Sequence, residues 1–176
     1  MDLCLATTEQ LTDVQLLAIR TLVVDAFEGT FDDHDWDHTV GGVHVFVVDE
    51  DVILAHGAVV ERTLVAGYRR LRCGYVEGVA TAGSHRRRGL GRKVMRKVEE
   101  VIRADFELGA LATGVPDFYE RLGWERWRGA TYVDSPSGRV RTEDDDDGIL
   151  VLRTATTSAL DTAASLTCDW REGDVW

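Results

Sequence analysis

The feature that most constrains this sequence is a run of three arginines followed by Gly-Leu-Gly, at residues 86–91. The preceding segment, Leu71–Ala80, is mostly apolar and rich in β-formers, which predicts a strand with a bulge or a close backbone approach at Gly78. Apolar residues then recur at helical spacing, at Leu90, Val94, Val98, Val101 and Ile102. The N–H groups and dipole at a helix N-terminus favour anions. In a chain of net charge −11, three arginines at this turn indicate a bulky anion such as a pyrophosphate.

Two familiar phosphate-binding motifs do not fit this turn. The dinucleotide fingerprint needs a further glycine before the segment and an acid after the next strand. A P-loop needs a Gly-Lys-Ser/Thr sequence, which is missing. A solvated, arginine-rich turn remains the alternative interpretation of these residues taken by themselves.

The rest of the chain predicts alternating helices and strands. We expect a helix over Leu11–Phe27, with Thr12 and Asp13 as capping candidates, and a second short helix near Asp35. A glycine directly after the last turn commonly ends a short helix. The remaining predictions are strands over Val43–Val48, Val52–Arg62, Phe106–Ala112, Tyr132–Val133 and Ile149–Leu152, a hairpin near Ala66–Gly67, and a short helix within Pro116–Trp124.

Length and composition favour one α/β domain over residues 1–176, since 44% of the residues are apolar. No run of about 18 apolar residues is present, and the start of the chain carries an acid, so we expect no membrane span and no signal peptide. Three widely spaced cysteines, Cys4, Cys73 and Cys168, favour reduced thiols in a cytoplasmic protein. We expect no metal: His34 and His38 lack a well-placed third ligand, and the acidic run at Glu143 lacks the glutamate that a calcium loop needs.

Acidic residues gather in three places, which disfavours nucleic acid as a partner and favours a cation. They occupy residues 32–37, the unbroken run 143–147, and the tail at Asp169, Glu172 and Asp174. A solubilising surface is the plainer interpretation of each cluster. The tail also carries Trp170 and Trp176. Either the indoles dock the tail on the core, or the tail offers Asp174 and Trp176 to a bound cation.

The Arg-x-x-Gly-x-Gly turn that follows a glycine-containing strand resembles the acyl-coenzyme A loop of the GCN5-related N-acetyltransferases, the GNAT family. The Phe-Tyr-x-x-x-Gly-Trp segment ending at Trp124 is also usual in that family. The resemblance implies a central mixed, mostly antiparallel sheet flanked by helices and splayed between its two central strands to hold acetyl-CoA. It implies that acetyl-CoA is bound by Val79, Ala80, Thr81, Arg86, Arg87, Arg88, Gly89, Leu90, Gly91 and Arg92.

Three further blocks, at residues 35–42, 71–80 and 168–176, resemble the aminoglycoside 2′-N-acetyltransferases. This resemblance implies acetyl transfer to a 2-deoxystreptamine aminoglycoside by a homodimer. It implies Glu77 as a base acting through water and Tyr119 as the acid for the leaving thiolate. It implies substrate contacts by Asp35, Glu77, Gly78, Asp146, Asp174 and Trp176. The chain departs from its relatives at Thr30 and in a shorter Ala112–Phe118 segment.

The chemistry of acyl transfer fits these roles. An ammonium must lose a proton before it attacks a thioester, and a carboxylate such as Glu77 can accept that proton. Backbone N–H groups around Gly78 and Val79 are candidates for stabilising the tetrahedral oxyanion. Glu77 as an ordinary strand residue and Tyr119 as a packing residue are the plain alternatives. Two other functions stay open: acetylation of a different amine, such as a polyamine or a peptide N-terminus, and a non-catalytic acyl-CoA-binding module.

Overall fold

The computed structural model describes all residues from Met1 to Trp176, and the chain divides into two compact units. Unit 1 comprises Met1–Val60 and Val76–Glu100, and unit 2 comprises Glu61–Tyr75 and Val101–Trp176. Two strands and one helix continue from one unit into the other: β3 (Val52–Ala66), β4 (Arg69–Thr81) and α3 (Leu90–Asp105). That residues 1–176 form a single domain remains a prediction alongside this division into two compact units.

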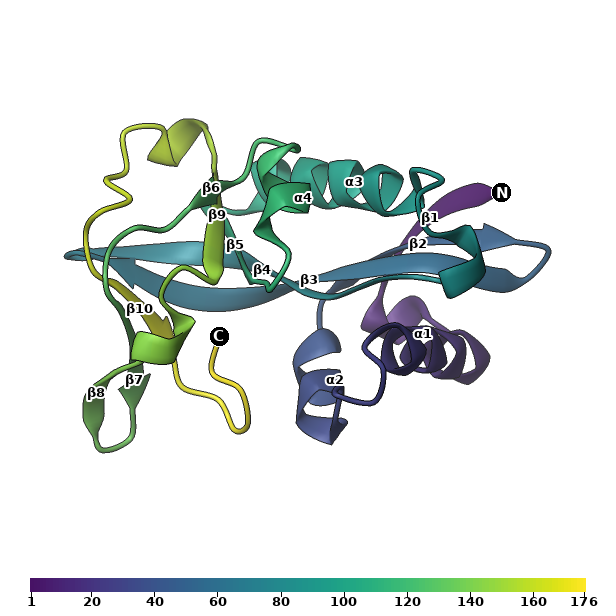
Figure 1. Ribbon diagram of the computed structural model, residues 1–176, viewed down its shortest axis with the longest axis horizontal. Helices are drawn as coiled ribbons and strands as arrows, with labels where there is room; N and C mark the ends of the chain where they lie inside the picture. Colours follow the sequence, from purple (N-terminus) through teal and green to yellow (C-terminus); the bar gives the residue numbers. More distant parts are fainter. The chain divides into compact units, whose positions relative to one another are not determined.

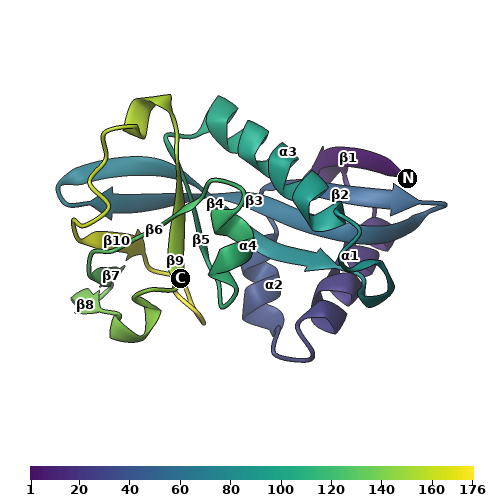
Figure 2. The ribbon, with the colours of Figure 1, turned by 45° about the horizontal axis from the view of Figure 1, so that its top comes forward.

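Unit 1 is a sheet with helices on both faces. Strand β1 (Asp2–Thr7) pairs antiparallel with β2 (Val43–Asp49), and β2 pairs antiparallel with β3. Helices α1 (Asp13–Ala26) and α2 (Asp33–Thr39) lie side by side on one face, and α3 lies on the other (Figure 1, Figure 2). Because side chains alternate along a strand, His56 and Gly57 of β3 face opposite ways. A Cβ on Gly57 would come within 3.1 Å of Val94 on α3, so α3 packs closely on that face.

Local capping interactions determine where the first two helices begin. The Thr12 side chain accepts a hydrogen bond from the backbone of Gln15, whose own side chain accepts one from the Thr12 N–H. This capping box confirms Thr12 as the cap and starts α1 at Asp13. In α2, Asp32 is the cap, and the Asp35 carboxylate accepts the Asp32 N–H at 3.0 Å. One oxygen of Asp35 therefore already stabilises its own helix.

Unit 2 is the mixed part of the sheet. Strand β5 (Leu108–Ala112) pairs parallel with β4 over Cys73–Tyr75 and antiparallel with β9 (Ile149–Arg153), which also pairs with the short β6 (Glu125–Arg126). Strand β10 (Leu166–Asp169) pairs antiparallel with β3 and parallel with β7 (Thr131–Ser135), and β7 forms a hairpin with β8 (Gly138–Arg141). Helix α4 (Pro116–Glu120) follows β5. The predicted mixed, mostly antiparallel sheet with flanking helices is confirmed.

Several boundaries differ from the sequence predictions. The predicted strand at Phe106 begins only at Leu108, because the Phe106 N–H still bonds to the carbonyl of Ile102 and extends the last turn of α3. Strand β3 runs on to Ala66 instead of ending at Arg62, because its end pairs with β10. The strands β1, β6, β8 and β10 were not predicted from the sequence. Strands β1, β6 and β10 gain their backbone partners from distant segments, and that pairing is not encoded in local periodicity, whereas β8 pairs with the neighbouring β7 in a hairpin.

The structure also bears on the general properties of the chain. All three cysteines are free, as predicted, and Cys73 and Cys168 are buried. None of the helices combines the length and the apolar character that crossing a lipid bilayer requires.

Candidate active site

The predicted coenzyme loop lies in unit 1 between β4 and α3. The chain turns through a short 3₁₀ segment, Gly83–His85, and then through positive φ angles at Arg87 (63°) and Gly89 (82°). The Lys93 N–H donates to the Gly89 carbonyl at 3.0 Å, so the N–H groups of the preceding first turn of α3 have no acceptor within the helix. This geometry is the one that binds phosphate at a helix N-terminus.

The three arginines of the loop have different surroundings. Arg86 donates to the carbonyl of Ala26, the last residue of α1, at 3.3 Å, which ties the loop to that helix. Arg87 and Arg88 are exposed. The structure therefore leaves Arg87 and Arg88 facing solvent beside the helix N-terminus, where a phosphate group would be attracted.

The backbone turns sharply at the Gly78 segment, which we define as Glu77–Val79 on β4. Gly78 has a φ of 57°, a conformation that favours glycine, and a Cβ there would come within 3.0 Å of Thr39. The predicted close backbone approach at Gly78 is thus confirmed. Thr39 ends α2 and donates its hydroxyl to the carbonyl of Asp35 at 2.8 Å. Unit 1 therefore packs the end of the Asp35 helix against the Gly78 segment, and Glu77 beside it is half-buried.

A chain of hydrogen bonds lies behind the Gly78 segment. The His56 Nδ1 is 2.8 Å from the Gly78 carbonyl, the His56 Nε2 is 2.9 Å from His44 Nδ1, and the His44 Nε2 is 2.9 Å from the Thr8 hydroxyl. Both imidazoles are fully buried. Burial lowers the pKa of His44 to about 4, and burial together with the neighbouring His44 lowers the pKa of His56 to about 3. Sequence reasoning missed this pair, although polar histidines inside two apolar strand runs were a visible signal.

Tyr119 lies in unit 2 on α4, with only 7% of its surface exposed. Its ring meets Phe118 edge-on, with centroids 4.9 Å apart, and approaches Trp124 at 6.3 Å. Burial raises the pKa of the Tyr119 hydroxyl to about 12, so the group stays protonated at neutral pH. The packing interpretation of Tyr119 is therefore correct for its ring, and its protonated hydroxyl retains the property that a proton donor requires.

The acidic run of residues 143–147 splits into two environments. Arg141 donates to both carboxylate oxygens of Asp146, and the N–H and hydroxyl of Thr131 donate to one of them at 3.0 and 2.8 Å. The Arg141 guanidinium, together with Thr131, holds the pKa of Asp146 well below its usual range. Asp145 behaves oppositely, because burial and the charges of Asp174 and Asp144 raise its pKa. The negative charge of Asp146 is thus already balanced by Arg141, whereas Asp145 is exposed to the negative charge of Asp174 in the tail.

The tail of unit 2 is held by two arginines. The buried Arg62 donates to the carboxylate and the carbonyl of Asp169, at 2.9 and 2.7 Å, and to the carbonyl of Val175 at 2.8 Å. Arg171 donates to the main-chain oxygens of Asp174 and Trp176. Neither arginine was predicted to have a role from the sequence.

The two tail tryptophans differ. The Trp176 indole is 3% exposed and donates to the Thr142 hydroxyl at 2.9 Å, so it docks the tail on unit 2. Trp170 is 39% exposed. Asp174 is also exposed. The docking interpretation therefore holds for Trp176, whereas the Asp174 carboxylate is among the parts of the tail that face solvent.

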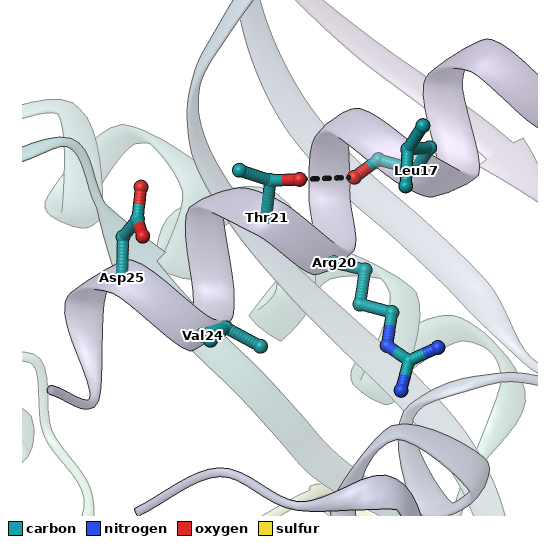
Figure 3. A pocket seen from close by; sticks show the side chains of 5 residues that line it. All are labelled: Leu17, Arg20, Thr21, Val24 and Asp25. Atoms are coloured by element: carbon teal, nitrogen blue, oxygen red, sulfur yellow. Dashed lines mark hydrogen bonds between the residues drawn. The ribbon is translucent and has the colours of Figure 1, made fainter. Parts of the chain in front are cut away.

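A separate depression of about 310 Å³ lies along α1, lined by Leu17, Arg20, Thr21, Val24 and Asp25 (Figure 3). One helix supplies all of its lining, and none of the predicted site residues is among them. No group of three or more His, Cys, Asp or Glu side chains is arranged to hold a metal ion.

The fold and the loop geometry agree with the comparisons to known proteins. Residues 8–127 match the family model described as an acetyltransferase (GNAT) domain, so the chain belongs to the GNAT family of acetyltransferases and to the transferase class of enzymes. The sequence is 45% identical, over 161 residues, to an aminoglycoside 2′-N-acetyltransferase of Mycolicibacterium fortuitum. That match covers 89% of this chain and 83% of the relative.

Solved structures show the same fold. The GNAT family N-acetyltransferase YhbS from Escherichia coli, in complex with CoA, superposes with a TM-score of 0.68 at 15% identity, covering 97% of this chain and 90% of that protein. A GCN5-related N-acetyltransferase from Kribbella flavida gives a TM-score of 0.59 at 27% identity, covering 73% of this chain. The chain spans only 35% of the length of the Kribbella protein.

Proposed function

We propose that this protein transfers the acetyl group of acetyl-CoA to the 2′-amine of aminoglycoside antibiotics, an activity that would confer resistance. The observation that carries the proposal is the 45% identity to an aminoglycoside 2′-N-acetyltransferase over most of both chains. Acetyl-CoA binds at the loop between β4 and α3. The contacts are made by the first turn of α3, by the loop arginines and by the backbone of Val79–Thr81.

The proposed chemistry is direct transfer in a ternary complex. Glu77 accepts a proton from the substrate ammonium through a water molecule, which frees the amine to attack the thioester carbonyl. The Val79 N–H donates to the oxyanion of the tetrahedral intermediate. Collapse of that intermediate expels the coenzyme A thiolate, which takes its proton from the hydroxyl of Tyr119, and the second proton that the nitrogen loses as the amide forms restores that hydroxyl through water. Holding both substrates together supplies much of the rate, so no covalent enzyme intermediate is required.

The proposed binding of the drug rests on charge. Aminoglycosides carry several ammonium groups, and carboxylates that lie close to one another gain most from a cation. The resemblance implies that Asp35 and Asp174 contact the drug. Trp176, which docks the end of the tail, is a third proposed contact. For the acidic run, the environment of Asp145 next to Asp174 fits an ammonium better than that of Asp146, which Arg141 already neutralises. We therefore assign the substrate contact of this run to Asp145, one residue before the position first predicted.

The test is the release of thiol from acetyl-CoA with a panel of aminoglycosides that carry or lack an amine at the 2′ carbon. Turnover restricted to the 2′-amine drugs is the expected result. Turnover with both kinds would keep the acetyltransferase and discard the 2′ assignment. Turnover of a polyamine or a peptide amine, with none of any drug, would replace the substrate class. Binding of acetyl-CoA without turnover of any amine would favour the non-catalytic module.

A further inference from the structure

The direction of every hydrogen bond in the His44–His56 chain follows from its last member. The Gly78 carbonyl can only accept, so the His56 Nδ1 carries the hydrogen. Since burial keeps His56 neutral, its Nε2 is then an acceptor, and the His44 Nδ1 must donate to it. By the same reasoning the His44 Nε2 accepts from the Thr8 hydroxyl. The Thr8 oxygen in turn accepts the Gly41 N–H at 2.8 Å.

All these hydrogen bonds point toward the Gly78 carbonyl, which shares one peptide group with the Val79 N–H. The chain has no cis peptide bond, so the Val79 N–H points away from His56 on the opposite side of that group. Hydrogen bonds arranged in series polarise one another. A donor on the carbonyl of an amide draws electron density toward oxygen and makes the N–H of the same amide a stronger donor.

We propose that His44 and His56 are positioning residues that orient and polarise the Gly78–Val79 peptide group so that the Val79 N–H stabilises the oxyanion of acetyl transfer. This inference rests on the proposed function. The pair is not a path for the substrate proton, because it ends at a carbonyl, which has no hydrogen to pass on. Its fixed location is consistent with that role: His56 touches Gly78 from one side and Thr39 from another element closes over the same glycine.

The kinetic test uses two variants of nearly the same shape, His56→Asn and His56→Leu. The asparagine Nδ2 lies where the histidine Nδ1 lies and can still donate to the Gly78 carbonyl, whereas leucine cannot. Both variants lose the contact with His44 equally. Removing an oxyanion donor costs about 10²- to 10³-fold in kcat, and weakening one should cost less. We expect kcat to fall about tenfold or more for His56→Leu, to stay within about threefold of wild type for His56→Asn, and the KM for acetyl-CoA to change little in both.

Equal losses of kcat in the two variants would mean that His44 and His56 only pack in the core, and would overturn the proposal. An unchanged kcat in His56→Leu would overturn it as well. A rise of the acetyl-CoA KM without a fall in kcat would also overturn it, because the effect would then be on binding of the coenzyme.

A spectroscopic test separates this proposal from the proposed function and does not require the leucine variant to fold. Nitrogen NMR of the wild-type imidazoles reports which ring nitrogen carries hydrogen. We expect the Nδ1–H form for both His44 and His56 at neutral pH, and a Val79 amide proton shifted downfield relative to the same proton in His44→Phe. An Nε2–H form of His56, or a Val79 amide proton that does not respond to His44→Phe, would overturn the proposal. Absence of drug turnover by the wild type would refute the proposed function alone.

Discussion

The buried histidine pair should make the stability of this protein fall steeply in mild acid. An imidazole has a pKa of about 6.5 in the unfolded chain, and in the folded protein the values are about 4 for His44 and about 3 for His56. Below pH 6.5 the unfolded state therefore binds more protons than the folded state. The stabilisation that each neutral imidazole provides is complete above pH 6.5 and is lost as the pH falls toward the folded pKa.

The magnitude follows from these pKa values. Between pH 8 and pH 5 each imidazole should reduce the free energy of unfolding by about 2 kcal/mol, so the pair should reduce it by about 4 kcal/mol. Stabilities of whole domains are only about 5–15 kcal/mol, so the loss is a large share of the total. Other groups titrate in the same pH range. Their contribution to the free energy of unfolding is subtracted by comparison with a variant that lacks the two imidazoles.

The matched variant is His44→Phe combined with His56→Asn, which keeps ring volume at the first position and a donor for Gly78 at the second. Urea unfolding of both proteins at pH 8, 7, 6 and 5 gives the two free energies of unfolding. The wild type should be the more stable protein at pH 8. We expect its advantage to shrink by about 4 kcal/mol by pH 5, or to reverse. A difference that stays constant within about 1 kcal/mol across that range would refute the assignment of two buried, neutral imidazoles.

Three further predictions concern unit 2. Tyr119→Phe should lower kcat by about 10²-fold or more with drug binding retained, and unchanged steady-state kinetics would remove Tyr119 from the mechanism. Asp145→Asn and Asp174→Asn should raise the KM for the drug and leave the KM for acetyl-CoA unchanged. Asp146→Asn should mainly lower the free energy of unfolding in urea, by about 1–3 kcal/mol. If Asp146→Asn instead raises the KM for the drug and Asp145→Asn lowers stability, the substrate contact returns to Asp146. Arg62→Met should destabilise the protein by about 3–5 kcal/mol, because it removes a buried cation that holds the tail, and a loss below about 1 kcal/mol would show that the tail needs no such anchor.

Much of the fold could be predicted from the sequence where the signals are local. The capping residue Thr12 and the amphipathic helix after Gly89 both depend on patterns within a few residues of the chain. Strands such as β1 and β10 could not be predicted in this way, because their partners lie in β2, β3 and β7, far away in the sequence.

The candidate site divides along the same line. The loop of three arginines, Glu77 and Tyr119 could be predicted as site residues from the sequence, because each sits in a short motif, and these roles remain predictions. The sequence predicts the substrate contact of the acidic run at Asp146, and five consecutive acids look alike until their neighbours are known. Arg141 and Thr131, which neutralise Asp146, come to it from a hairpin whose pairing the sequence analysis did not contain.

The sequence by itself determined the family of this protein and its acidic character, and it predicted the coenzyme loop, because short motifs and composition need no partner to be recognised. Only the tertiary structure decided which groups are charged, buried or held in one orientation. His44, His56 and Gly78 are separated by 12 and 22 residues, and Arg62 and Asp169 by 107, yet each set is in hydrogen-bonding contact. A pKa or a tautomer depends on burial and on such partners, and the folded chain alone brings them together.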